Sequence, residues 1–144
     1  MREYEEAIKS FDKVIAIEPN NTAALLNKGY EQIEIGDYLG SVRTFNRVLA
    51  LEPNNTEAYT NKGIALYNIG RYDEALLAIE KVTSLNPGLS SAWTTKGFLL
   101  IKTGNIEQSI AAFDRALELN PGDIEAQQGK IKATRIKWPS YQGF

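Results

Sequence analysis

Apolar residues recur along this chain at three- and four-residue steps, the spacing of one face of an α-helix. The stretch 72–85 is typical, and its apolar stripe consists of Tyr72, Ala75, Leu76, Ile79, Val82 and Leu85. Each helical stretch ends at a glycine, which admits a left-handed turn, or just before a proline, which pushes the preceding residue out of the α region. The pattern predicts about eight helices and no strand, the helices lying near 3–17, 22–35, 38–51, 56–69, 72–85, 90–103, 106–119 and 123–137.

This punctuation repeats with a period of 34 residues. Three series keep the spacing: the prolines Pro19, Pro53, Pro87 and Pro121, the mid-helix glycines Gly29, Gly63 and Gly97, and the turn glycines Gly36, Gly70 and Gly104. A fixed period of this length indicates a stacked repeat in which each unit is one pair of helices. Hydroxyl side chains at the start of the first helix in each pair are predicted to cap it: Thr22, Thr56 and Ser90.

The period divides the chain into three full units between two half-units, together forming a single domain over 1–144. The full units are 22–55, 56–89 and 90–123. Residues 1–21 supply only the second helix of a pair, 124–137 supply a capping first helix, and 138–144 form a tail. Glycine inside a helix costs stability, so its recurrence predicts close helix approach. The predicted opposing positions are small: Ala7, Ser41, Ala75 and Ser109.

Composition excludes most catalytic and metal chemistry. The chain has no cysteine and no histidine, which removes the usual nucleophilic thiol, the commonest general base and the ligands of zinc. Its net charge of -2 argues against nucleic acid as a partner. No apolar run is long enough to cross a bilayer, and the charged start is unlike a signal peptide. We therefore expect a cytoplasmic protein that is not an enzyme, has no cofactor and no metal, and binds neither nucleic acid nor membrane.

The repeat resembles the tetratricopeptide repeat family. The shared features are the mid-helix glycine, the turn glycine followed by Tyr38 or Tyr72, the small residue and aromatic of the second helix, and the terminal proline. Two departures are a lysine before the mid-helix glycine, where the family usually has leucine, and Ile106 in place of the tyrosine. The resemblance covers nearly the whole chain and implies a right-handed α-solenoid of stacked antiparallel helix pairs.

In this family the first helices line a concave groove that binds an extended or helical peptide, so the resemblance implies a protein-interaction scaffold. Carried over to this chain, the groove positions are Leu26, Asn27, Tyr30, Ile33, Thr60, Asn61, Ile64, Tyr67, Asn68, Thr94, Thr95, Phe98, Ile101 and Lys102. Some relatives clamp acidic chaperone tails with lysine, arginine and asparagine. At those places this chain keeps only Asn61, so it is not expected to bind such tails.

Two alternatives stay open beside the peptide groove. The chain could be a purely structural or self-assembling fragment whose ends stack on other units, with weak self-association through the N-terminal half-unit or the tail. Trp138, Tyr141 or Phe144 would then pack on an apolar surface. A helical-repeat reader of nucleic acid is the less favoured alternative, because that role needs a basic groove.

Overall fold

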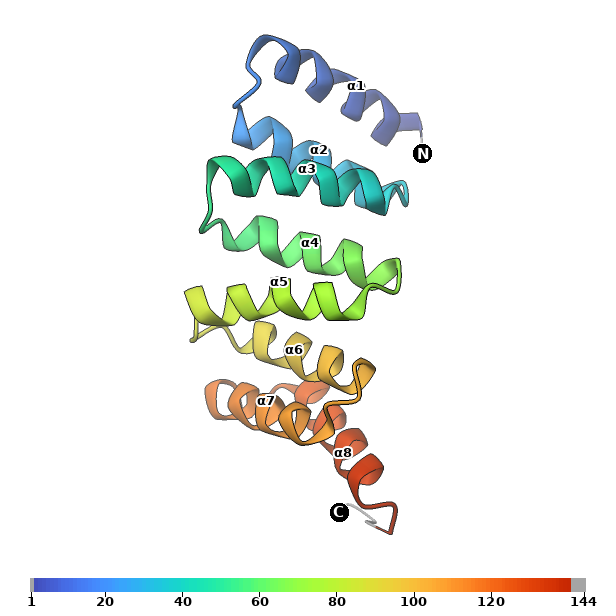
Figure 1. Cartoon of the computed structure of the whole chain (residues 1–144), viewed down its shortest axis with the longest axis vertical. Coiled ribbons are helices and arrows are strands. Elements are labelled where there is room, and N and C mark those ends of the chain that lie inside the picture. Colours follow the sequence, from blue (N-terminus) through green and yellow to red (C-terminus); the bar gives the residue numbers. More distant parts are fainter. Residues whose placement is uncertain (1, 141–144) are drawn as a thin grey trace. The chain divides into compact units, whose positions relative to one another are not determined.

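The computed structural model describes residues 2–140, and these residues form eight helices and no strand (Figure 1). The helices are α1 (Arg2–Ile17), α2 (Thr22–Glu34), α3 (Tyr38–Leu51), α4 (Thr56–Asn68), α5 (Tyr72–Leu85), α6 (Ser90–Lys102), α7 (Ile106–Leu119) and α8 (Ile124–Lys137). The predicted all-α fold is confirmed, and every predicted boundary lies within one residue of the observed one.

The chain divides after Arg71 into two compact units. Unit 1 contains α1 to α4 and unit 2 contains α5 to α8, and within each unit consecutive helices run side by side in alternating directions (Figure 1). In addition, α2 contacts α4 and α6 contacts α8, so first helices of successive pairs are neighbours. The prediction of a single domain stays a prediction.

The predicted caps are displaced by one residue. The side chain of Asn21 accepts the backbone N–H of Ala24, and Asn55 caps α4 in the same way, whereas Leu89 gives α6 no side-chain cap. Thr22 is the first helical residue, and its hydroxyl bonds to the carboxylate of Glu52 and lowers the pKa of that group. Asparagine and threonine can both cap a helix, so from the sequence Asn-Thr either residue could have been the cap.

Two of the mid-helix glycines, Gly29 and Gly97, lie directly against an aromatic ring. A Cβ atom built on Gly29 would lie 2.6 Å from Cζ of Phe45, and one on Gly97 would lie 2.5 Å from Cε1 of Phe113. Both rings are completely buried. Ser41 and Ser109 are also completely buried, and their position opposite these glycines stays a prediction.

Three of the four first helices carry a lysine that pairs with an acidic residue of the helix before it. In α4 the equivalent residue is Lys62, and the residue 16 positions before it is Asn46. Lys28 pairs with Asp12 at 2.5 Å, Lys96 with Glu80 at 3.2 Å and Lys130 with Asp114 at 2.6 Å. Each lysine follows its partner by 16 residues, and this interval recurs in three of the four pairs of successive helices. The three lysine side chains are 19%, 21% and 43% exposed, and each amine pairs with a carboxylate.

Unit 1 also contains a buried polar network that has no counterpart in unit 2. The hydroxyl of Thr44 lies 2.6 Å from Oε1 of Gln32, and Nε2 of Gln32 donates to Asp37 at 3.0 Å. Gln32 and Thr44 are 7% and 6% exposed. Two periods further along, unit 2 has Leu100 and Ala112, which are both buried. An apolar pair can therefore fill the same two places in the repeat.

We expect Thr44→Ala alone to lower the free energy of unfolding by about 1–3 kcal/mol, because the buried carbonyl of Gln32 loses its donor. The double variant Gln32→Leu/Thr44→Ala removes both partners and should be at least as stable as Thr44→Ala. Urea unfolding measures both values. A double variant that is less stable than the single one would show that the network stabilises unit 1.

Candidate functional site

In unit 1 the candidate site is built on a hydrogen-bonded link between α2 and α4. The phenol of Tyr30 donates to the carboxylate of Glu57. The amide Nδ2 of Asn61 lies 3.2 Å from the same phenol oxygen and 2.8 Å from the backbone carbonyl of Glu57. Tyr30 and Asn61, which the sequence placed on separate helices of one groove, are thus in direct contact.

The Tyr30 ring of this link packs against the core of unit 1. The ring of Tyr30 stands edge-on to Phe45, with 5.9 Å between ring centroids and 69° between ring planes. Burial raises the pKa of the Tyr30 phenol, and the hydrogen bond to Glu57 raises it further. The phenol is therefore a protonated donor throughout the neutral range. Tyr30 therefore has a structural role, since it connects α2 to α4 and keeps its proton.

The remaining unit 1 positions divide into packed and exposed side chains. Leu26 and Ile33 are half-buried and pack against the core. Ile64 and Tyr67 are each 41% exposed, and Asn27 and Asn68 are exposed as well. Thr60 is half-buried and its hydroxyl bonds to the carbonyl of Thr56. The accessible groove positions of unit 1 therefore combine two apolar side chains with amide groups.

In unit 2 the predicted positions lie on α6, and one of them is not accessible. Thr94 is 4% exposed, and its hydroxyl donates to Oδ2 of Asp123 at 2.7 Å. Asp123 also caps α8 by accepting the N–H of Ala126, and the two bonds together lower its pKa, the backbone bond most. Thr94 thus serves to anchor the start of α8 and leaves little surface for a ligand.

The other α6 positions lie at or near the surface. Phe98 is half-buried and stands edge-on to Phe113, with ring centroids 5.1 Å apart. Ile101 packs against the same core cluster. Thr95 is exposed, and Nζ of Lys102 lies 5.5 Å from the ring centroid of Tyr72. This part of the surface is mainly the edge of the unit 2 core.

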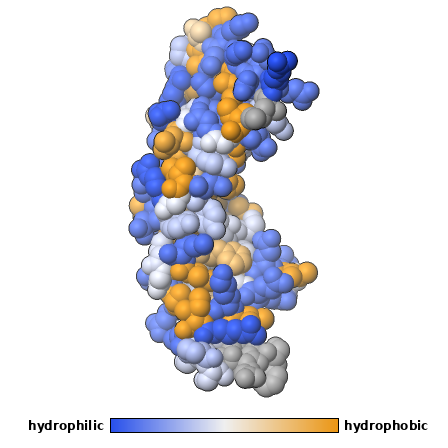
Figure 2. Space-filling view, turned by 90° about the vertical axis from the view of Figure 1, so that its right-hand side faces the viewer, coloured by the Kyte–Doolittle hydropathy of each residue, from blue (hydrophilic) through white to orange (hydrophobic). Residues whose placement is uncertain are grey.

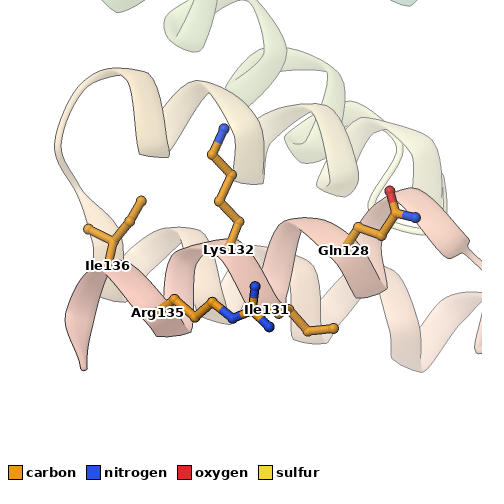
Figure 3. Close-up of a pocket in the computed structure, with 5 residues that line it drawn as sticks. All are labelled: Gln128, Ile131, Lys132, Arg135 and Ile136. Carbon is orange, nitrogen blue, oxygen red and sulfur yellow. The ribbon is translucent and has the colours of Figure 1, made fainter. Parts of the chain in front are cut away.

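A further face on α8 was missed at the sequence level. Five of its side chains line a shallow depression (Figure 3): Gln128, Ile131, Lys132, Arg135 and Ile136. From the sequence, α8 was interpreted as a cap with a solvated cationic face that includes Lys132 and Arg135. The signal was present, since these residues follow one another at the three- and four-residue steps of one helix face.

The described surface can be searched for metal-binding groups, membrane spans and apolar patches. Among residues 2–140 no group of three or more acidic side chains could hold a metal ion. Within the same part of the chain, no helix is both long and apolar enough to span a membrane. On the face seen in Figure 2, hydrophobic residues form small patches between hydrophilic ones.

Comparison with known proteins gives consistent matches. Three family models, each described as tetratricopeptide repeat, match residues 1–21, 26–90 and 70–132. No curated protein sequence shows significant similarity to the chain.

Solved structures show the same architecture. The crystal structure of MamA is 26% identical with a TM-score of 0.89, and the match covers 93% of this chain and 78% of that one. YrrB, described as a TPR protein with an unusual peptide-binding site, is 26% identical with a TM-score of 0.81, covering 90% and 67%. The first TPR of Spaghetti (RPAP3), bound to the HSP90 peptide SRMEEVD, is 21% identical with a TM-score of 0.76, covering 81% and 92%, and shows the fold alone. The predicted α-solenoid class is confirmed by these likenesses.

Proposed function

Because this chain belongs to the tetratricopeptide repeat family, we propose that it is a protein-interaction module that binds a peptide segment of another protein and catalyses no reaction. The observation that carries the proposal is the Tyr30–Glu57–Asn61 link, which fixes the facing surfaces of α2 and α4. A surface fixed before binding loses less conformational entropy when a peptide docks. A cytoplasmic location is part of the same proposal.

The chemistry of the unit 1 surface suits an extended or helical peptide. Amide side chains can donate to and accept from a peptide backbone, and Asn27 and Asn68 are exposed for this purpose. Ile64 and Tyr67 offer apolar contact beside them. In unit 2 we assign the same role to Thr95, Phe98, Ile101 and Lys102 on α6. YrrB, whose peptide-binding site is described as unusual, supports a peptide ligand by analogy.

The acidic-tail mode is not the one proposed. The RPAP3 domain shares the fold and is bound to a peptide that ends in Glu-Val-Asp. Gripping such carboxylates requires cationic side chains. The charges beside the proposed surface are mixed, because Glu34 and Glu57 are acidic and Lys102 of α6 is basic. We therefore propose a ligand that is recognised by backbone and apolar contacts, with weak salt dependence.

We expect Asn61→Ala/Tyr67→Ala to weaken peptide binding by about tenfold or more, since an exposed tyrosine in a binding surface commonly contributes more than 1 kcal/mol. Peptides selected from a random displayed library against the intact chain provide the ligands, and fluorescence anisotropy measures their affinity. The matched control is Tyr4→Ala/Asn46→Ala, which removes the same side-chain types from exposed positions on α1 and α3. Selected peptides that bind the groove variant and the control equally well would exclude this surface.

Self-association is the second candidate, and the exposure of α1 favours it. Ile17 is 81% exposed, Val14 39% and Tyr4 38%. Exposed apolar side chains of this kind promote contact with another molecule. Trp138 is 50% exposed, and Nζ of Lys137 lies 4.4 Å from its ring centroid. Tyr141 and Phe144, which the sequence analysis also named, lie outside the described residues.

A further inference from the structure

Unit 2 has a second pocket, on the side of α6 that points away from the proposed peptide surface. Its volume is about 300 Å³, and its lining includes Glu80 of α5, Trp93 and Lys96 of α6, and Gln108 and Ala111 of α7. At 100° per residue, Trp93 and Lys96 lie on the face of α6 opposite to Thr95 and Phe98. Each of these three helices has a further helix before and after it in the chain, so the pocket lies within the repeat and not at its ends.

One corner of this pocket already holds a positive charge. Nζ of Lys96 lies 3.2 Å from Oε1 of Glu80 and 5.4 Å from the ring centroid of Trp93. The indole N–H of Trp93 donates to the backbone carbonyl of Pro87 at 2.9 Å, which fixes the ring. A carboxylate and an aromatic face at such distances both attract a cation. The corner formed by Glu80 and Trp93 therefore has the chemistry of a cation site.

The Lys96 ammonium does not use the full capacity of this corner. The side chain of Glu80 is 42% exposed, whereas that of Lys96 is 21% exposed. Within the described part of the chain, Oε2 of Glu80 takes part in no hydrogen bond or ion pair. A carboxylate has two oxygens and accepts hydrogen bonds from several donors. A second cation can therefore pair with Glu80 while Lys96 stays in place.

The equivalent place in unit 1 indicates which kind of cation fits. Two periods before Ala111 the chain has Arg43, and the acid–lysine pair of that unit is Asp12 and Lys28. Unit 2 keeps the acid–lysine pair but has an exposed alanine where unit 1 has an arginine. The small side chain of Ala111 leaves room for a long cationic side chain that comes from another molecule.

We propose that this pocket receives an arginine side chain of a partner protein, at a site separate from the peptide surface. The guanidinium pairs with Oε2 of Glu80 and lies against the Trp93 ring, because this planar group both bonds to carboxylates and stacks on aromatic faces. Its charge is delocalised, which lessens its repulsion from Lys96. The exposed Gln108 amide oxygen accepts a further N–H, and the methylene groups of the arginine pack on Ala111. A volume at the lower end of small-molecule sites suits one inserted side chain.

The test uses the intact chain labelled with ¹⁵N and blocked synthetic peptides. The probe is acetyl-ALRLA-amide, and its matches carry citrulline or glutamate in place of arginine. We expect the arginine probe to shift the indole N–H signal of Trp93, which a Trp138→Phe background separates from the other tryptophan signal. The arginine probe should bind at least about fivefold more tightly than the citrulline match and should lose affinity as salt is added.

Two variants of the pocket have matched controls. Ala111→Arg places the arginine of unit 1 in the pocket and should weaken the probe by about fivefold or more. Its control, Ala50→Arg, adds the same charge at an exposed position of α3 and should leave affinity within about twofold. Glu80→Gln should also weaken the probe by about fivefold or more, and Glu125→Gln at an exposed position of α8 is its control.

Several outcomes would overturn the proposal. One is a Trp93 signal that does not move at any soluble concentration of the arginine probe, and another is equal binding of the arginine and citrulline peptides. A third is an equal effect of each pocket variant and its control. Tighter binding of the glutamate match would show that Lys96 selects an anion instead. Asn61→Ala/Tyr67→Ala should leave the Trp93 response unchanged, and a lost response in that variant would assign the probe to the peptide surface.

Discussion

Gly97→Val should lower the free energy of unfolding by about 3 kcal/mol, even though valine suits a helix better than glycine. The new side chain would enter the space of the Phe113 ring, whose Cε1, Cδ1 and Cζ atoms all come within 2.7 Å of a Cβ at this position. The ring cannot retreat, because Gly129 of α8 meets it from another side. The overpacking is therefore transmitted to three helices, and chemical unfolding measures it as a lower midpoint.

Two companion variants separate overpacking from a general effect of replacing glycine. Gly88→Ala adds a methyl group whose nearest neighbour, Oδ1 of Asn86, is 3.8 Å away, and it should change stability by less than about 0.5 kcal/mol. Gly97→Ala should also lower the free energy of unfolding, because its methyl group meets the Phe113 ring. Adding Phe113→Leu to Gly97→Ala should recover part of that loss, because leucine is smaller and leaves space for the methyl group. If Gly97→Val unfolded at the same midpoint as the parent chain, the glycine would not be a contact point.

The fold was predictable because the residues that end its helices act locally. Gly36, Gly70 and Gly104 adopt positive φ angles of 80°, 76° and 82°, a backbone conformation that few other residues tolerate. The prolines that end the second helices act in the same local way. Helix boundaries set by one or two neighbouring residues can be read from sequence, which is why all eight helices of the described residues matched.

Contacts between helices were predicted less well, because they depend on the directions in which the side chains of two neighbouring helices point. The glycine series indicated a close approach, but spacing alone did not show that Phe45 and Phe113 fill it. Thr94 is equivalent in the repeat to the half-buried Leu26 and Thr60, and its hydrogen bond to Asp123, the cap of α8, could not be read from that spacing. The lysine–acid pairs could have been found, since the interval of 16 residues recurs three times.

The groove itself was predictable only as a set of positions. Tyr30 and Asn61 are 31 residues apart, and nothing in their spacing indicates that a phenol, an amide and the Glu57 carboxylate meet. These contacts depend on how α2 packs against α4, and that packing is determined by the whole unit. That packing in turn depends on Phe45, so the surface that we assign to peptide binding and the core beneath it can be tested together.

Phe45→Ala should lower the free energy of unfolding by about 3–5 kcal/mol, the range seen when a buried aromatic leaves a cavity. Phe45 is 0% exposed and packs in a cluster with Ile15, Leu25 and Val48, so the space cannot fill with water. The ring of Tyr30 also loses the aromatic edge that supports it. We therefore expect faster hydrogen exchange in α2 and α3 and a weaker Tyr30–Glu57 contact, in addition to the lower unfolding midpoint.

Tyr30→Phe is the control that divides the two effects. It keeps the ring against Phe45 and removes only the phenol oxygen, so we expect a loss of about 1 kcal/mol in stability and normal hydrogen exchange in α3. Peptide affinity should fall in both variants, because each releases Glu57 and Asn61 from their fixed positions, and the fall should be larger in Phe45→Ala. Unchanged affinity in Phe45→Ala, with the chain still folded, would mean that binding does not require the α2–α4 link and would move the peptide site away from unit 1.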